Sequence, residues 1–103
     1  MLVVGDVSLN LDRRTVAIEG RATHCLTPKL TLLLEVCIRR RDSLVSRTML
    51  MLLVWDTDYL ADTRTLDVHI RWFRRAIEED PSKPTRLTTV RGKGYLFNTM
   101  PRS

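Results

Sequence analysis

The sequence predicts an α+β fold, with a small antiparallel sheet, three helices and a C-terminal β-hairpin in that order. Three observations predict it. Residues 2–26 alternate short apolar runs with turn residues, residues 27–80 place apolar side chains at helical spacing, and residues 85–99 hold two β-rich runs around a glycine-containing turn. The chain has 103 residues, so we expect residues 1–103 to form one domain with its own core.

The N-terminal sheet is predicted to have four short antiparallel strands. Clusters of Gly, Asp, Arg and Glu interrupt the apolar runs at residues 5–6, 12–14 and 19–20, and such clusters are typical of turns. The predicted strands are Val3–Val4, Val7–Leu11, Thr15–Ile18 and Arg21–Cys25.

The first helix is predicted to begin at Pro28. Thr27 is a favourable N-cap, and proline is favourable at the first helical position because its missing N–H would have no partner there. Three arginines, residues 39–41, end the helix with cations that suit its C-terminal dipole. The predicted core positions of this helix are Leu30, Leu33, Leu34, Cys37 and Ile38.

The second helix is predicted to start after Ser46, its N-cap, and to run to about Trp55. Leu50, Leu53 and Val54 are its predicted buried side. Met49, Met51 and Leu52 make the helix apolar nearly all round. In one interpretation, the methionines fill the core of the domain. The alternative is an apolar contact surface, because so small a domain cannot bury every side of a helix.

The third helix, residues 63–79, is predicted to be long and amphipathic. Its apolar stripe must face a core, and the opposite side is basic. A solvated basic face is the simpler interpretation, but only Asp67 adds an acid among the arginines, which favours a face that meets phosphates and base edges. The stripe is Leu66, Ile70, Phe73 and Ile77; the outward residues are Arg64, Val68, Arg71 and Arg75, flanked by Trp72 and Arg74.

The C-terminal hairpin is predicted to carry a basic tip. Gly92 and Gly94 bracket Lys93 and permit the positive φ angles that a tight reversal needs. Residues 83–93 contain no acid and four cations, namely Lys83, Arg86, Arg91 and Lys93. The second and third helices then form a helix-turn-helix with a long turn, and the hairpin is its wing. Such a helix suits the major groove of duplex DNA, and a cationic tip suits the minor groove.

The composition indicates a polyanionic partner. The net charge is +5 and the pI is about 9.9, although charge alone does not separate nucleic acid from an anionic membrane surface. The sequence has no run of 18 apolar residues and no signal peptide, so we expect a cytoplasmic protein without a membrane partner. Cys25 and Cys37 lack Cys-x-x-Cys spacing and are expected as reduced thiols. No nucleophile–base pair, phosphate loop or metal-ligand spacing stands out, so we expect no catalysis, cofactor or metal.

The chain resembles the C-terminal DNA-binding domain of OmpR/PhoB-type response regulators. The resemblance covers nearly all 103 residues. It implies a winged helix-turn-helix behind an N-terminal four-stranded sheet. It also implies sequence-specific binding of double-stranded DNA, as the effector domain of a bacterial two-component transcriptional regulator that a receiver domain and a cognate histidine kinase control by phosphorylation. The matching stretches are Leu26–Lys29, Val45–Trp55, Asp62–Arg71 and Thr89–Tyr95.

The resemblance implies a set of DNA-binding residues. On the helix, the arginines and His69 would bind phosphate or base edges and Val68 would touch a thymine methyl. Trp72 stands where many members carry a base-reading arginine, so we expect a different base preference. On the hairpin, Thr89 would contact the DNA backbone and Arg91 would enter the minor groove. The full set is Arg64, Thr65, Val68, His69, Arg71, Trp72, Arg74, Arg75, Thr89, Arg91 and Lys93.

The resemblance also implies protein partners. The loop of residues 56–62 matches the segment that contacts RNA polymerase in activating members, through Asp56, Asp58, Tyr59 and Leu60. Nothing in the chain resembles the receiver domain, so we expect an excised effector domain. Because the receiver supplies the symmetric dimer in the family, we expect a monomer that occupies directly repeated half-sites. The competing interpretation is a winged-helix module that docks an acidic protein surface or RNA, but such a module does not need both Arg91 and the Arg64/Arg71 stripe.

Overall fold

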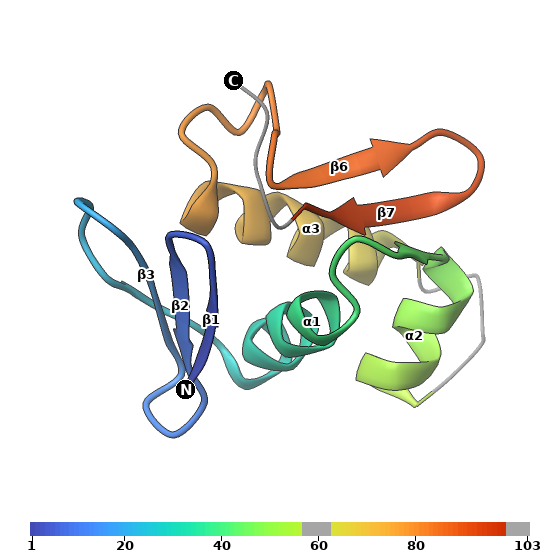
Figure 1. The fold of residues 1–103 in the computed structure, drawn as a ribbon. Helices are drawn as coiled ribbons and strands as arrows, with labels where there is room; N and C mark the ends of the chain where they lie inside the picture. The colour runs from blue at the N-terminus through green and yellow to red at the C-terminus, as the bar shows by residue number, and fades with distance from the viewer. Residues whose placement is uncertain (57–62, 99–103) are drawn as a thin grey trace.

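The computed structural model describes residues 1–56 and 63–98 and confirms the α+β fold (Figure 1). The N-terminal sheet lies at one end of the molecule and α2 at the other, with α1 and α3 between them. The elements are β1 (Leu2–Val4), β2 (Val7–Asn10), β3 (Thr15–Ile18), β4 (His24–Cys25), α1 (Pro28–Arg39), β5 (Leu44–Val45), α2 (Arg47–Trp55), α3 (Thr63–Ile77), β6 (Leu87–Val90) and β7 (Gly94–Phe97).

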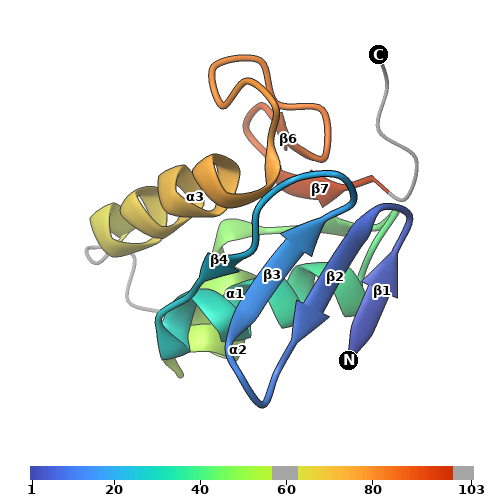
Figure 2. The same ribbon diagram turned by 90° about the vertical axis from the view of Figure 1, so that its left-hand side faces the viewer.

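The N-terminal sheet is antiparallel in the order β1-β2-β3-β4, and one of its faces is covered by the helices (Figure 2). The pairs Val4↔Val7 and Leu9↔Val16 place buried side chains on that inner face. The fourth strand is shorter than the predicted 21–25. The Arg21 N–H turns back to the Ile18 carbonyl at 2.9 Å, so the chain is still reversing at the point where the strand was predicted to start.

The predicted caps of the first two helices are present. Thr27 Oγ1 accepts a hydrogen bond from the Leu30 N–H at 3.2 Å, and Pro28 is the first residue of α1. Ser46 Oγ accepts from the Met49 N–H at 3.1 Å at the start of α2. Helix α2 ends at Trp55, where Asp56 takes a left-handed conformation.

The buried side of α2 differs from the prediction. Leu50, Met51 and Val54 face the core, whereas Leu53 is 39% exposed. At 100° per residue, Met51 and Leu53 lie equally far from the direction of Leu50 and Val54, on opposite sides of it, so helical spacing alone does not choose between them and the packing of α2 in the domain decides which is buried. Met51 therefore fills the core and contributes to no contact surface. The exposed apolar side chains of α2 are Met49, Leu52 and Leu53.

Helix α3 buries the predicted stripe of Leu66, Ile70, Phe73 and Ile77 but ends at Ile77, two residues before the predicted end. The next residue is Glu78, whose N–H still bonds to the Arg74 carbonyl at 2.8 Å and whose side chain is almost completely buried. Its carboxylate accepts hydrogen bonds from the backbone N–H groups of Arg86, at 3.0 and 3.1 Å, and of Leu87, at 3.1 Å. Glu78, which was predicted to lie inside the helix, thus binds the first residues of the hairpin through its side chain.

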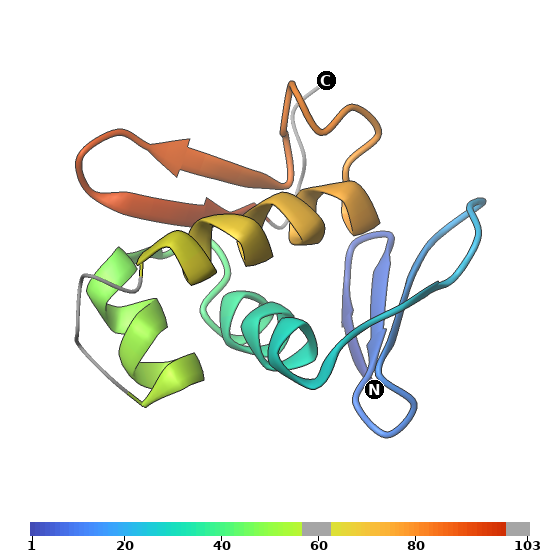
Figure 3. The ribbon, with the colours of Figure 1, turned by 180° about the vertical axis from the view of Figure 1, so that it is seen from behind.

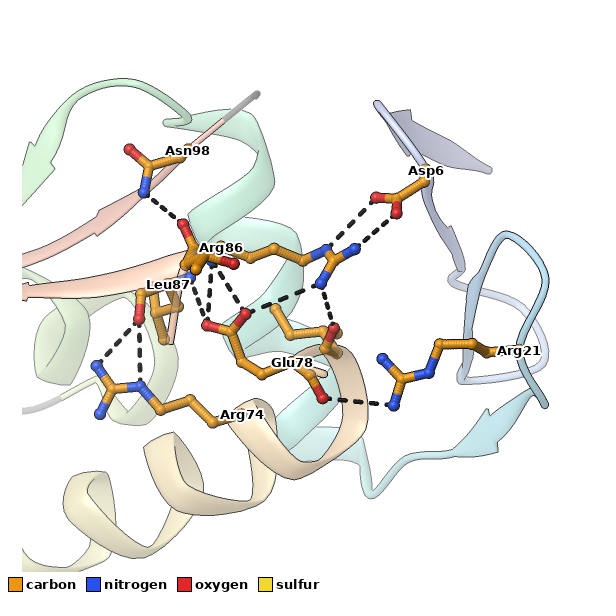
Figure 4. Close-up of polar contacts among 9 residues, drawn as sticks. Asp6, Arg21, Arg74, Glu78, Arg86, Leu87 and Asn98 are labelled. Carbon is orange, nitrogen blue, oxygen red and sulfur yellow. Dashed lines mark hydrogen bonds and ion pairs between the residues drawn. The ribbon is translucent and has the colours of Figure 1, made fainter. Parts of the chain in front are cut away.

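Arg86 is the second member of this buried network (Figure 4). Its guanidinium donates to the Ile77 carbonyl at 3.0 Å and to the Asp6 carboxylate at 2.6 Å, and it lies 3.9 Å from a Glu78 carboxylate oxygen. The sequence placed Arg86 among the cations of the basic hairpin, and this was wrong. A charge so deeply buried needs charged and polar partners, and Arg86 finds them on α3 and in the N-terminal sheet.

The C-terminal hairpin belongs to a three-stranded sheet in the order β5-β7-β6. The sequence did not predict β5, which is only two residues long. Gly94 lies against this strand, because a Cβ added to Gly94 would come within 2.2 Å of the Val45 carbonyl oxygen. Gly94 is therefore required by the close approach of two backbones. Gly92, with φ of +74°, has the turn role that was predicted for both glycines.

The two cysteines are both free and differ in environment. Cys25 is exposed, whereas Cys37 lies in the core and burial raises the pKa of its thiol to about 12. Across the part of the chain that the structure describes, no group of His, Cys, Asp and Glu side chains could hold a metal ion. In residues 1–56 and 63–98, no helix has the length and apolar character needed to cross a membrane.

We predict that Gly94→Ala lowers the free energy of unfolding by at least about 3 kcal/mol, because the new methyl group would overlap the backbone of β5 at a φ that disfavours other residues. Gly20→Ala is the matched control. Its φ of +79° is also positive but its surroundings are open, so only the strain of about 1–2 kcal/mol is expected. Urea denaturation measures both, and equal losses would show that the contact with β5 is unimportant.

Candidate nucleic-acid interface

Helix α3 lies across the front of the molecule in Figure 3, with one side turned away from α1 and the hairpin. The side opposite the buried stripe carries the exposed arginines Arg64, Arg71 and Arg75. Val68 and Trp72 lie among them, 40% and 41% exposed. Thr65 is also exposed, and His69 is half-buried. The structure therefore brings most of the predicted helix residues to one open surface, and arginine there offers the planar donors that suit phosphates and guanine.

The one acid of this helix is neutralised within the domain. Asp67 accepts a hydrogen bond from Arg47 Nη2 at 2.7 Å, and Arg47 Nη1 donates to the Tyr95 hydroxyl at 2.8 Å. Arg47 thus joins α2, α3 and β7. Sequence reasoning missed it; the only signal was a cation in the first turn of α2, where the helix dipole disfavours positive charge.

Arg74, one of the predicted DNA contacts, makes hydrogen bonds within the domain. Its Nε and Nη2 donate to the Leu87 carbonyl at 3.2 and 3.0 Å, and Nη2 donates to Thr89 Oγ1 at 2.7 Å. The guanidinium also lies 5.8 Å from the centroid of the Tyr95 ring. Arg74 therefore fastens the hairpin to α3. Thr89, the predicted backbone contact, therefore has a structural bond within the domain.

His69 lies in an aromatic cluster at the junction of α2 and α3. Its Nδ1 is 2.8 Å from the Thr65 carbonyl oxygen, so this nitrogen carries the proton and donates it. The ring centroid is 5.0 Å from Trp55 and 5.1 Å from Trp72. His69 is thus fixed by three neighbours. Sequence reasoning placed it on the DNA-facing side but did not foresee that it supports Trp72.

The hairpin tip is the second basic surface. Arg91 and Lys93 are exposed in the turn between β6 and β7. Beside the tip lies a groove of about 610 Å³ between the hairpin and the first residues of α2. The groove is lined by Ser46, Arg47, Thr48 and residues 89–95.

Of the loop predicted to contact RNA polymerase, Asp56 is exposed at the end of α2, whereas Asp58, Tyr59 and Leu60 lie outside the described residues.

A three-helix core with a β-hairpin beside an exposed basic helix defines the class of winged helix-turn-helix domains. Residues 21–97 match the family described as transcriptional regulatory protein, C terminal. The chain belongs to this family, the OmpR/PhoB-type C-terminal DNA-binding domains.

The chain is similar to regulators from several bacteria. It is 45% identical over 92 residues to a protein of Picosynechococcus sp. named as a probable transcriptional regulatory protein, covering 89% of this chain and 36% of that protein. It is 41% identical over 95 residues to the sensory transduction protein RegX3 of Mycolicibacterium smegmatis, covering 92% of this chain and 41% of that protein. The chain therefore spans well under half the length of these two relatives.

The fold is similar to that of the Klebsiella pneumoniae RstA DNA-binding domain, whose crystal structure is a complex with the RstA box. The TM-score is 0.82 at 24% identity, covering 95% of this chain and 96% of that one. At 24% identity, this similarity shows that the two domains have the same fold.

We predict that Arg74→Ala lowers the free energy of unfolding by about 2 kcal/mol, because it removes the three hydrogen bonds that join α3 to β6. Arg75→Ala is the control: this neighbour is exposed, so its loss should change stability by less than about 0.5 kcal/mol. Thermal or urea denaturation of the two variants without DNA measures the contrast. Equal stability of the two variants would show that Arg74 has no structural role.

Proposed function

We propose that this domain binds double-stranded DNA in a sequence-specific manner, as the effector part of a two-component transcriptional regulator. The single observation that carries the proposal is the pair of neighbouring basic surfaces, the outward face of α3 and the tip of the β6-β7 hairpin. Membership of the transcriptional regulatory family supports it. Two such surfaces on adjacent elements match the two grooves of a duplex.

The outward residues of α3 would act in the major groove. Arg64, Arg71 and Arg75 are exposed and available for phosphates or base edges, and Thr65 is available for a further polar contact. Val68, His69 and Trp72 would lie against base edges. Arg74 and Thr89 would act chiefly by holding the hairpin in place, because their polar atoms already bond to each other.

The hairpin tip would act in the minor groove. Arg91 would enter it, where the narrow walls concentrate the negative potential of the phosphates, and Lys93 would contact the adjacent backbone. The groove beside the tip, at the start of α2, would receive part of the backbone of one strand.

The partners of the whole protein belong to the same proposal. The relatives are more than twice as long as the matched region, which supports a receiver domain in the complete regulator and a cognate histidine kinase that phosphorylates it in the cytoplasm. Directly repeated half-sites would then bring two effector domains side by side on one face of the DNA. Asp56 and the loop that follows it would contact RNA polymerase in an activator.

The proposal predicts binding that weakens steeply with salt. If roughly four to six phosphates are neutralised, log K should fall with log salt at a slope of about −4 to −5. Selection of genomic fragments with the purified domain, followed by mobility-shift titrations at several salt concentrations, tests this. A flat salt dependence, or recovery of no preferred sequence, would contradict the proposed function.

We also predict that Arg91→Ala weakens binding by about 1–3 kcal/mol, more on sites with an A·T-rich flank than on G·C-rich ones, because a narrow minor groove attracts an inserted arginine. Arg13→Ala is the control, since Arg13 is equally exposed but lies in a turn of the N-terminal sheet. Fluorescence anisotropy with matched duplexes measures both. Small and equal losses on the two flanks would place the hairpin outside the minor groove.

A further inference from the structure

Two large apolar side chains lie on the outward face of α3. Contact with water is unfavourable for apolar side chains, so a face that met only solvent would not need them. Val68 is 40% exposed and Trp72 is 41% exposed. They are four residues apart, so they lie one above the other on the helix and form a continuous surface. The exposed arginines Arg64, Arg71 and Arg75 lie on the same face. An apolar surface surrounded by phosphate-binding cations marks a place where the ligand itself offers an apolar group.

The indole of Trp72 is held in position before any ligand arrives. The His69 ring lies 5.1 Å from it at an interplanar angle of 59°, and His69 is in turn fixed by the Thr65 carbonyl at 2.8 Å and by the edge of Trp55. A side chain supported in this way loses little conformational freedom on binding, which favours a contact that depends on shape.

The chemistry of the major groove identifies the ligand group. Each base edge there presents hydrogen-bond donors and acceptors, and only thymine adds an apolar group, its C5 methyl. Tryptophan has a single N–H donor and no acceptor, so it cannot make the two hydrogen bonds by which arginine selects guanine. Its exposed ring suits a methyl group instead.

We propose that Trp72, held by His69, reads the C5 methyl group of a thymine next to the base that Val68 contacts. The inference rests on the proposed function and specifies its ligand: the binding site contains adjacent thymines in the major groove that faces α3, and the domain discriminates them by their methyl groups. Trp72 is a residue that determines specificity, and His69 is the residue that positions it.

The test removes methyl groups without altering any hydrogen bond. A preferred duplex is selected from random sequence with the wild-type domain, and each thymine is replaced in turn by deoxyuridine. Anisotropy titration should show Kd rising about fourfold at two neighbouring positions, the effect of losing one methyl contact at each. Unchanged Kd at every position would overturn the inference.

Variants assign the two positions. Trp72→Ala should remove the rise in Kd caused by uracil at the position that Trp72 contacts and leave the rise at the Val68 position. Val68→Ala should have the opposite effect. Trp72→Phe, which keeps an aromatic ring, should retain part of the sensitivity, and His69→Ala should reduce it at the Trp72 position. Trp72→Arg should instead select sites with guanine there. Leu53→Ala, an apolar side chain of 39% exposure on α2, is the matched control and should change nothing.

The outcomes separate this inference from the proposed function. Thermal unfolding of each variant identifies losses that come from misfolding, and Trp72→Phe keeps the test open if Trp72→Ala unfolds. A domain that shows salt-dependent DNA binding, but in which Trp72→Ala weakens thymine and uracil sites equally, overturns the inference alone. A domain that binds no duplex at any salt concentration overturns both.

Discussion

The buried carboxylate of Glu78 is the constraint on which the rest of the structure depends. It accepts the N–H groups of Arg86 and Leu87 at the start of β6, and the Arg86 guanidinium connects the same point to the end of α3 and to Asp6 in the N-terminal sheet. Buried charges are tolerated only with partners of good geometry, so the network has few alternative arrangements. It therefore joins the end of α3 to the start of the hairpin.

Three charged links hold the hairpin. Glu78 and Arg86 fix its base, and Arg74 of α3 bonds to the base at Leu87 and to Thr89 further along β6. Arg47 of α2 bonds to Tyr95, the residue of β7 that is paired with Thr89. Each of these links uses a charged donor or acceptor, which makes a stronger hydrogen bond than a neutral pair. Because the links join both strands of the hairpin to the helices, the basic helix face and the basic tip keep one relative position, as the proposed contact with two grooves of a duplex requires.

The arginines of this chain serve two purposes, and only part of the net charge of +5 faces a ligand. Arg47, Arg74 and Arg86 are used inside the domain as donors that join elements. Arg64, Arg71, Arg75 and Arg91 remain at the exposed surface. A domain with a small core gains rigidity from such links. Val68 and Trp72 add an exposed apolar surface to the same face of α3.

The sequence by itself determined the features that depend on near neighbours. The caps at Thr27 and Ser46, the buried stripe of α3 and the hairpin turn follow from spacing and local backbone preferences, and motif spacing identified the family. The tertiary structure alone decided the features whose partners are distant. Arg86 and Asp6 are 80 residues apart, so the sequence could not show that this cation is buried. The contact of Gly94 with β5 and the hydrogen bonds of Arg74 to β6 have the same cause: each depends on which element lies alongside, and a local pattern does not contain that information.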